Sequence, residues 1–286
     1  MAIRFNGLLC VQETVETVSN HGAHGNTPLK RGVNENEVDM SDVFGSTRTA
    51  VKLRYALLTP DSFVPSSLAG WQNAVCVVNI SPALGARFTQ LHITLGKDGS
   101  GEGNTGPHQY LIYIIDGAGT IALADKRHRL ESGTYVYLPP GKDMQVKNNG
   151  ESMRLLVFQK PYEVLKDTPA PATIVGHERE VKGQPFLGNE DARLQVLLPD
   201  KREFDMAVNI FTYQPGATLP FVEAHIMEHG LLMLKGQGVY RLESDWHPVK
   251  EGDAIWMAPY CPQWFVAMGK TPASYIYYKD VNREPM

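Results

Sequence analysis

The sequence has few cysteines, no long apolar run and no strong excess of one charge. Only three cysteines occur in 286 residues, Cys10, Cys76 and Cys261, and they lie far apart. An odd number at this spacing argues against a disulfide framework or a cysteine-rich zinc cluster. No stretch reaches the roughly 18 apolar residues that cross a bilayer, and the apolar segment 5–11 is too short for a signal-peptide core. We therefore expect a cytoplasmic protein that does not bind a membrane.

The charge balance narrows the range of partners. Charged residues make up 20% of the chain and hydrophobic residues 43%, and the formal net charge is −4. These values are typical of a soluble globular protein. Because there is no basic excess, nothing favours binding to nucleic acid, and we expect a small molecule as the partner.

Short strands dominate the pattern of the chain, and no amphipathic helix of convincing length interrupts them. From about residue 55 onward, apolar or alternating runs are separated by Gly, Pro, Asn and Asp, which is typical of an all-β protein. The expected strands are 74–80, 88–95, 111–115, 134–138, 153–158, 194–198, 206–213, 230–234, 238–242, 254–257 and 274–278.

The two halves of the chain repeat the same order of glycine and proline residues between strands. Each has a strand that ends in a Gly-x-Gly turn, at 117–119 and 236–238, followed by a Gly that opens an apolar run ending at Pro, at 133–139 and 252–259. This repetition predicts the duplication of one β-unit. A polar N-terminal stretch and a Pro-rich segment at 166–172 mark the boundaries. We expect an N-terminal arm (1–50), a first barrel (51–165), a linker (166–185) and a second barrel (186–286).

The repeated unit resembles the cupin double motif, which implies two tandem cupin barrels (a bicupin, each barrel a double-stranded β-helix or jelly roll). The first half keeps the glycines, proline and asparagine of the second motif. Met144, however, stands where cupins have a metal-binding histidine, and the ligand positions of the first motif hold Asn104, Gly106 and Tyr110. None of these makes a convincing ligand set, so we expect no metal in the first barrel.

The second half places ligand-type residues in every ligand position of the cupin motif. Glu223, His225 and His229 share one face of an extended chain, whereas Glu228 points the other way. Gln263 stands where cupins usually have the fourth ligand. Taken alone, two nearby histidines in a β-protein are more often surface or hydrogen-bonded core residues. Their place in the duplicated frame, and the cost of an unpaired inward carboxylate, favour a metal site. Its mixed oxygen and nitrogen donors suit Mn²⁺, Fe²⁺ or another six-coordinate ion better than tetrahedral zinc.

A closer resemblance covers roughly residues 50–286 and is stronger in the second half. The chain is similar to the (S)-ureidoglycine aminohydrolases, bicupins of purine-nitrogen recovery. This resemblance implies Mn²⁺-dependent hydrolysis of (S)-ureidoglycine to (S)-ureidoglycolate and ammonia, with one metal ion per chain in the second barrel. It also implies a homo-oligomer built from dimers. The stretches that carry it are 223–230, 236–240, 246–249, 252–253, 262–264 and, above all, 278–283.

The same resemblance implies roles for individual residues. The metal ligands would be Glu223, His225, His229 and Gln263, and the substrate would contact Glu223, Tyr240, Tyr275 and Lys279. For the two tyrosines, simple filling of the barrel is an alternative. Lys279 is harder to explain in that way, because an inward ammonium is costly without a partner. Glu223 is either a permanent ligand or a general base, and Glu223 and Lys279 are the candidate catalytic residues.

Two other classes of function remain open on the sequence. Another metal-cupin enzyme, such as a dioxygenase or an isomerase, would use similar ligands, and redox-active iron with oxygen consumption would identify it. A non-enzymatic cupin that binds a small molecule would show affinity without turnover.

Overall fold

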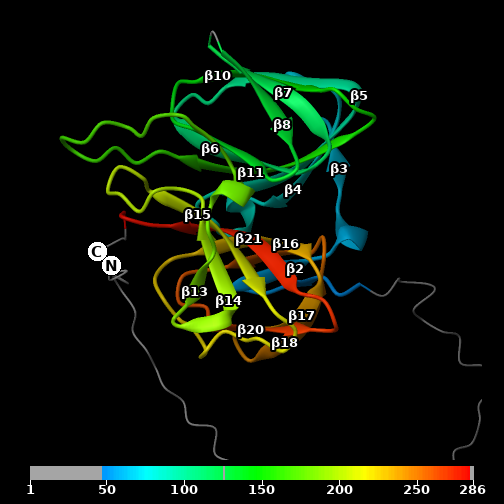
Figure 1. Cartoon of the computed structure of the whole chain (residues 1–286), viewed down its shortest axis with the longest axis vertical. Coiled ribbons are helices and arrows are strands. Elements are labelled where there is room, and N and C mark those ends of the chain that lie inside the picture. The colour runs from blue at the N-terminus through cyan, green and yellow to red at the C-terminus, as the bar shows by residue number, and fades with distance from the viewer. Residues whose placement is uncertain (1–46, 125, 284–286) are drawn as a thin grey trace, which may run out of the picture.

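The computed structural model describes residues 47–124 and 126–283. Most of the expected N-terminal arm, residues 1–46, therefore lies outside the described residues. Within them the chain is built from short and long β-strands, and its only helices are three 3-10 turns, η1 (Pro60–Ser62), η2 (Pro82–Leu84) and η3 (Glu178–Glu180). None of the helices in these ranges could span a membrane. Two barrels lie one above the other (Figure 1), which confirms the all-β prediction with two tandem barrels.

The first barrel is a single curled sheet of ten strands. Along the sheet the order is β12-β9-β6-β11-β5-β10-β7-β8, with β4 also paired to β5 and β3 paired to β4. Its strands are β3 (Pro65–Ser66), β4 (Trp71–Ile80), β5 (Thr89–Asn104), β6 (His108–Asp116), β7 (Ala118–Leu123), β8 (Lys126–Glu131), β9 (Thr134–Leu138), β10 (Asp143–Asn148), β11 (Met153–Pro161) and β12 (Ile174–His177).

The second barrel consists of two sheets. An eight-stranded sheet has the order β1-β2-β19-β16-β21-β15-β14-β13, and a three-stranded sheet has the order β18-β17-β20. The strands are β1 (Ala50–Val51), β2 (Tyr55–Leu58), β13 (Gln184–Phe186), β14 (Asn189–Val196), β15 (Met206–Tyr213), β16 (His229–Lys235), β17 (Gln237–Leu242), β18 (Asp245–Lys250), β19 (Ala254–Met257), β20 (Gln263–Met268) and β21 (Ala273–Asp280).

The two barrels exchange strands across the boundaries expected from the sequence. Strand β2 lies in the range assigned to the first barrel, yet it pairs with β19 of the second. Strand β12 lies in the expected linker and pairs with β9 of the first barrel. Because β9 and β19 occupy corresponding places in the repeat, each barrel takes the strand that precedes the other barrel in the sequence. A linker is expected from Pro-rich composition alone, which carries no information on such pairing.

Three apolar cores hold the molecule together. One fills the first barrel, a second fills the second barrel, and a third lies between them. Alternation along β21 shows how this works, since Tyr275 and Tyr277 point into the second barrel while Ile276 and Tyr278 join the core between the barrels. The ring of Tyr278 stacks on Phe88 of the first barrel at a centroid distance of 4.1 Å. Strands buried on both faces read as continuous apolar runs.

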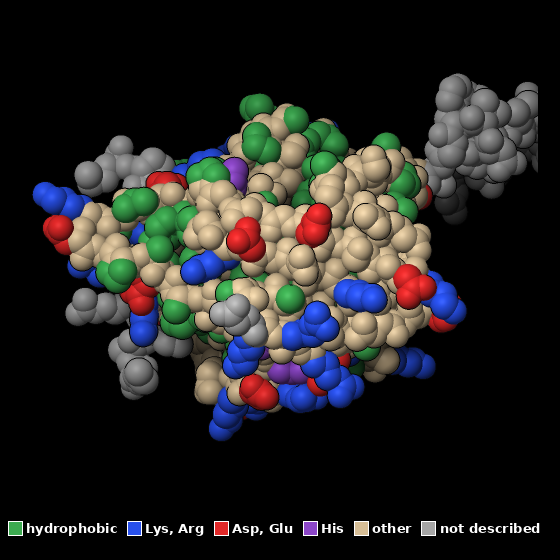
Figure 2. All heavy atoms as spheres, turned by 90° about the horizontal axis from the view of Figure 1, so that it is seen from above, with side chains coloured by type: hydrophobic (Ala, Val, Ile, Leu, Met, Phe, Trp, Pro, Cys, Tyr) green, Lys and Arg blue, Asp and Glu red, His purple; other side chains and the backbone are tan. Residues whose placement is uncertain are grey.

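Charged side chains of both signs lie on the face of the first barrel that is seen from above (Figure 2). Lys and Arg lie interspersed there with Asp and Glu. This mixture on that face is in keeping with the small net charge of −4.

A cation from the first barrel contacts the second barrel beside two residues singled out in the sequence, His229 and Lys279. The Arg87 guanidinium forms ion pairs with Glu228, at 3.3 Å, and with Asp280. Its backbone N–H also donates to both Glu228 oxygens, at 3.0 and 3.2 Å, and the Glu228 N–H donates to Asp280 at 2.7 Å. Glu228 precedes His229 and Asp280 follows Lys279, so this network fixes the backbone of two site residues from outside the second barrel.

We expect Arg87→Met to weaken the fold, because Glu228 and Asp280 would be left buried without a counter-charge. The loss of unfolding free energy should be roughly 2 to 3 kcal/mol, less than for a fully buried pair, because the Arg87 side chain is 37% exposed. Urea denaturation would measure it. Burial raises the pKa of both carboxyl groups, so the deficit should shrink as the pH falls and they take up protons. Arg129→Met is the control, because Arg129 is 80% exposed and its ion pair with Glu131 is long, at 3.8 Å. An equal loss in both variants would contradict the expectation.

Candidate active site

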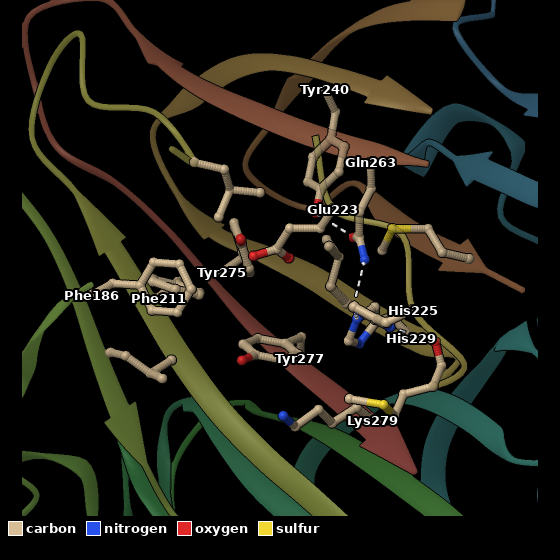
Figure 3. A pocket seen from close by; sticks show the side chains of 15 residues that line it. Phe186, Phe211, Glu223, His225, His229, Tyr240, Gln263, Tyr275, Tyr277 and Lys279 are labelled. Atoms are coloured by element: carbon tan, nitrogen blue, oxygen red, sulfur yellow. Dashed lines mark hydrogen bonds between the residues drawn. The ribbon is translucent and has the colours of Figure 1, made fainter. Parts of the chain in front are cut away.

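A cavity inside the second barrel gathers the residues singled out in the sequence. Strands β15, β16, β17, β20 and β21 and the connection between β15 and β16 contribute to its wall. Apolar and aromatic side chains line most of it, with a small set of polar groups among them, which is the usual composition of a small-molecule site. The lining includes Glu223, His225, His229, Tyr240, Gln263, Tyr275, Tyr277 and Lys279 (Figure 3).

Backbone pairing holds Glu223 opposite Gln263. The two residues exchange N–H···O=C bonds of 2.8 Å in both directions, and they form an isolated β-bridge between the β15–β16 connection and the first residue of β20. Directly paired residues in antiparallel chains place their side chains on the same face. His225 is anchored in a similar way, because its carbonyl accepts a hydrogen bond of 2.7 Å from the Tyr260 N–H. Backbone hydrogen bonds thus hold Glu223, His225 and Gln263 in place relative to one another, although the first two lie outside the regular strands.

The two histidines face each other through their Nε2 atoms, which are 3.0 Å apart. The Nδ1 atom of His225 lies 3.2 Å from the carbonyl oxygen of Met227, and that of His229 lies 3.2 Å from the carbonyl oxygen of Tyr278. A carbonyl oxygen only accepts, so each Nδ1 carries the proton and each Nε2 presents a lone pair. Burial lowers the pKa of His225 to about 4 and that of His229 well below its usual range. Both rings are therefore neutral at pH 7.

This arrangement fits a divalent metal ion. Two lone pairs 3.0 Å apart without a proton between them repel unless a cation lies between them. Two nitrogens bound at right angles about 2.1 Å from one ion are roughly 3.0 Å apart. The Gln263 Nε2 atom lies 3.2 Å from the His225 Nε2 atom, while Tyr240 donates to Gln263 Oε1 at 3.3 Å. A turn of the Gln263 amide would present its oxygen to the same point.

The Glu223 carboxylate lies apart from the group formed by His225, His229 and Gln263. Figure 3 shows it pointing away from the two imidazoles, and the described ranges contain no cluster of three His, Cys, Asp or Glu arranged for a metal. Rotation of the half-buried Glu223 side chain is required if it is to be a ligand. Burial raises the pKa of Glu223 to about 7, although the positive charge of Lys279 acts in the opposite direction. A carboxyl group in this pKa range can accept and release a proton near neutral pH.

Lys279 is a half-buried cation without a close anionic partner. Across residues 47–124 and 126–283, no hydrogen bond or ion pair within 4.0 Å involves its Nζ atom. Burial lowers the pKa of Lys279, and the negative charges of Glu223, Asp200 and Asp280 partly oppose that shift. An ammonium held near a cavity without a paired carboxylate is suited to receive an anionic ligand.

Three buried tyrosines, Tyr240, Tyr275 and Tyr277, line the cavity, and a fourth, Tyr213, contacts Tyr275. The hydroxyl groups of Tyr213 and Tyr275 are 3.0 Å apart, and burial raises the pKa of both. Burial likewise raises the pKa of Tyr240 and Tyr277. All of these hydroxyls therefore remain protonated at neutral pH and serve as neutral hydrogen-bonding groups. The structure brings together both tyrosines that the sequence analysis selected, Tyr240 and Tyr275.

Sequence reasoning missed one polar pair beside the cavity. The Asn209 side chain on β15 donates to the Tyr277 hydroxyl at 3.0 Å. A signal was available, because Asn209 interrupts the otherwise apolar centre of the strand at 206–213. Asn209 is only 3% exposed, and burial of an amide needs a reason.

The interior of the first barrel is apolar at the corresponding positions. Met144 is buried among Ile, Leu and Val side chains, and Tyr110 packs against the same core. Asn104 bonds locally, since its amide donates to Asp143 at 2.6 Å and its oxygen accepts from the Gly106 N–H at 2.7 Å. The ligand positions themselves therefore hold Asn104, Gly106, Tyr110 and Met144, none of which is a carboxylate or an imidazole, and the expectation of a metal-free first barrel stays a prediction.

Comparison with known proteins identifies the class of the protein. A sequence profile of the cupin domain matches residues 91–158 and 209–278, one match in each barrel, so the chain is a tandem cupin protein. The crystal structure of protein Ylba from E. coli superimposes with a TM-score of 0.76 at 32% identity, covering 86% of this chain and 98% of that chain.

Two curated plant proteins narrow the class further. A probable (S)-ureidoglycine aminohydrolase of Oryza sativa subsp. japonica is 39% identical, over 86% of this chain and 79% of its own length. The (S)-ureidoglycine aminohydrolase of Arabidopsis thaliana is 38% identical, over 86% of this chain and 82% of its own length. The chain belongs to the (S)-ureidoglycine aminohydrolase family. This membership makes it a hydrolase, in place of the dioxygenase, isomerase or binding protein left open by the sequence, and it suggests a metal cofactor.

We expect His229→Ala to abolish metal binding, because it removes one of the two Nε2 donors that face each other. Elemental analysis should give about one ion per wild-type chain and far less in the variant. His92→Ala in the first barrel is the control and should keep the ion. A content near two ions per chain, or full retention in His229→Ala, would contradict the assignment.

Proposed function

We propose that the chain hydrolyses (S)-ureidoglycine to (S)-ureidoglycolate and ammonia during purine breakdown, in the cavity of the second barrel. The observation that carries the proposal is the unpaired ammonium of Lys279 in the same small cavity as Glu223 and two neutral imidazoles. (S)-Ureidoglycine has a carboxylate, an amine and a ureido group on one carbon. Such a compact anion needs a cation for its carboxylate, an electrophilic anchor and a base for water, and these groups supply that set.

The metal of the proposed site is Mn²⁺, one ion per chain, held by Glu223, His225, His229 and Gln263. The two neutral imidazoles and the reorientable amide of Gln263 support this assignment. A mixed oxygen and nitrogen donor set favours a six-coordinate ion of this kind. When bound, the ion would supply a positive charge that anchors and polarises the substrate.

The chain's own residues would bind and orient the substrate. Lys279 meets the carboxylate, and its half-buried position strengthens that ion pair relative to one in water. Tyr240 and Tyr275 offer neutral hydroxyl groups to the amine and the ureido group. The apolar rings around them exclude bulk water, which strengthens the polar contacts to the bound substrate.

When the substrate binds, Glu223 would turn away from the ion and act as the general base. A carboxyl group whose pKa is raised to about 7 is partly ionised at neutral pH and takes a proton from water without becoming trapped in the acid form. Water then forms the new C–O bond at the central carbon. The amine, bound as its ammonium form, leaves with the electrons of the C–N bond as ammonia. Glu223 finally releases its proton to solvent, so that protons and charges balance.

The stereochemistry of the reaction constrains the positions of water and amine. In the substrate the ureido nitrogen outranks the amine nitrogen, whereas in the product the new hydroxyl outranks the ureido nitrogen. An (S) substrate and an (S) product therefore require inversion at the carbon. Water must approach from the face opposite the amine. Glu223 would hold water on one face, with its carboxylate turned away from the imidazoles as in Figure 3.

The fold and the family support a proposal for the setting of the enzyme. We propose a cytoplasmic homo-oligomer built from dimers, whose partner is the small-molecule substrate and not nucleic acid or membrane. Sheet edges at the barrel rims, such as β8 and β13, favour association because an open edge is protected by a neighbour.

Incubation of the metal-loaded protein with freshly generated ureidoglycine tests the function directly. Ammonia release above the spontaneous rate, with (S)-ureidoglycolate as product, is the expected result. Ammonia at the spontaneous rate, or a racemic product, would contradict the proposal.

Lys279→Met should keep the metal but lose substrate binding, because it preserves much of the side-chain length and removes the charge. We expect kcat/KM to fall. The loss of transition-state binding energy calculated from the ratio of kcat/KM values should be roughly 2 to 4 kcal/mol, measured by initial rates at matched metal content. Lys235→Met is a matched control at an exposed position on β16. Unchanged kcat/KM in Lys279→Met would rule out the ion pair.

A further inference from the structure

The Asn209–Tyr277 pair has a buried hydrogen-bonding capacity that the fold does not use. The Asn209 Nδ2 group donates to the Tyr277 hydroxyl at 3.0 Å. An amide N–H cannot accept, so the hydroxyl oxygen is the acceptor and its own proton is left for another group. The Asn209 Oδ1 atom is also buried, and it has no hydrogen-bond partner in the described part of the chain.

Packing fixes where the Tyr277 hydroxyl lies. The Tyr277 ring stacks on Phe211 at a centroid distance of 6.0 Å and meets the His229 ring edge-on at 5.4 Å. Its side chain lines the cavity, and it is only 9% exposed. Figure 3 shows the Tyr277 hydroxyl and the Lys279 ammonium pointing to the same side of the cavity. A donor held in this way by neighbours is preorganised for a ligand.

A pure stability role explains the pair poorly. Burying an amide leaves a cost of roughly 1 to 3 kcal/mol for each unpaired polar group, and here a single hydrogen bond leaves Asn209 Oδ1 without a partner. Two apolar side chains of similar shape would pack in the same space without that cost. The cost is explained if the pair orients a proton toward a ligand.

We propose that the Tyr277 hydroxyl donates a hydrogen bond to the ureido carbonyl oxygen of the substrate, and that Asn209 positions it. The proposal rests on the function proposed above. Lys279, two residues farther along the same face of β21, supplies the charge for the carboxylate. The neutral hydroxyl of Tyr277 is then matched to the neutral carbonyl acceptor of the substrate. Tyr277 is a specificity-determining residue, and Asn209 is a positioning residue.

Two ligands separate this contact from a contact with the carboxylate. (S)-Ureidoglycolate contains the ureido group, whereas glycolate has the same carboxylate and hydroxyl without it. Calorimetric titration of the metal-loaded protein with each ligand reports binding without turnover. We expect Tyr277→Phe to bind ureidoglycolate roughly tenfold more weakly and to bind glycolate as the wild type does. Tyr135→Phe, a buried tyrosine of the first barrel, is the control and should change neither affinity.

Asn209→Leu tests the positioning role while leaving the hydroxyl in place. We expect a smaller loss of ureidoglycolate affinity than in Tyr277→Phe, and no further loss when both changes are combined. Additive losses would overturn the positioning role. Equal losses for both ligands in Tyr277→Phe, or no loss for either, would overturn the contact with the ureido group.

The failure of this contact is distinguishable from failure of the proposed function. A wild-type protein that turns over ureidoglycine while Tyr277→Phe binds ureidoglycolate normally would refute the contact alone. A metal-loaded wild type that neither hydrolyses ureidoglycine nor binds ureidoglycolate would refute the function, and with it the contact. Circular dichroism of each variant establishes that the fold is retained.

Discussion

The double burial of strand β21 is the constraint on which the site depends. One face of this strand enters the core between the barrels through Ile276 and Tyr278, and the other carries Tyr275 and Tyr277 into the cavity. A strand packed on both sides cannot shift by one residue, because every side chain would move to the opposite face. Lys279 continues the inner face, and His229 pairs with it across the sheet. The relative placement of these two groups is therefore set by packing that lies outside the cavity.

The first barrel acts on the chemistry through that packing. Phe88 stacks on Tyr278, and Arg87 forms ion pairs with Glu228 and Asp280. These two carboxylates lie next to His229 and Lys279 in the sequence, and the Glu228 N–H also donates to Asp280. A barrel whose own interior is filled with aliphatic side chains thus serves as a rigid support for its neighbour. Sites held by packed neighbours keep their geometry better than sites on free loops.

Much of the architecture could be predicted from the sequence, for identifiable reasons. Period-two patterning and turn residues located most strands, and the expected segments 134–138, 206–213 and 254–257 coincide with β9, β15 and β19. The segment expected at 194–198 is shifted, because β14 runs from Asn189 to Val196 through polar residues that composition alone does not mark as strand. The spacing of the cupin motif predicted that His225, His229 and Gln263 lie close together, and the Nε2 atom of His225 lies 3.0 Å from that of His229 and 3.2 Å from that of Gln263. The orientation of the Glu223 carboxylate depends on tertiary packing (Figure 3). The local pattern marks Asn209 as a polar residue in an apolar strand, but it does not identify Tyr277 as its partner.

The exchange of β2 and β12 has a consequence for the divisibility of the molecule. A fragment that begins after residue 165 would lack β2, and its strand β19 would become an open edge. A fragment that ends at residue 165 would lack β12 and expose β9 in the same way. Unprotected edges recruit strands from other chains, so such halves are prone to aggregate. We therefore expect neither half of the gene to encode an independent folding unit, because a cut between the repeats removes a strand from both barrels.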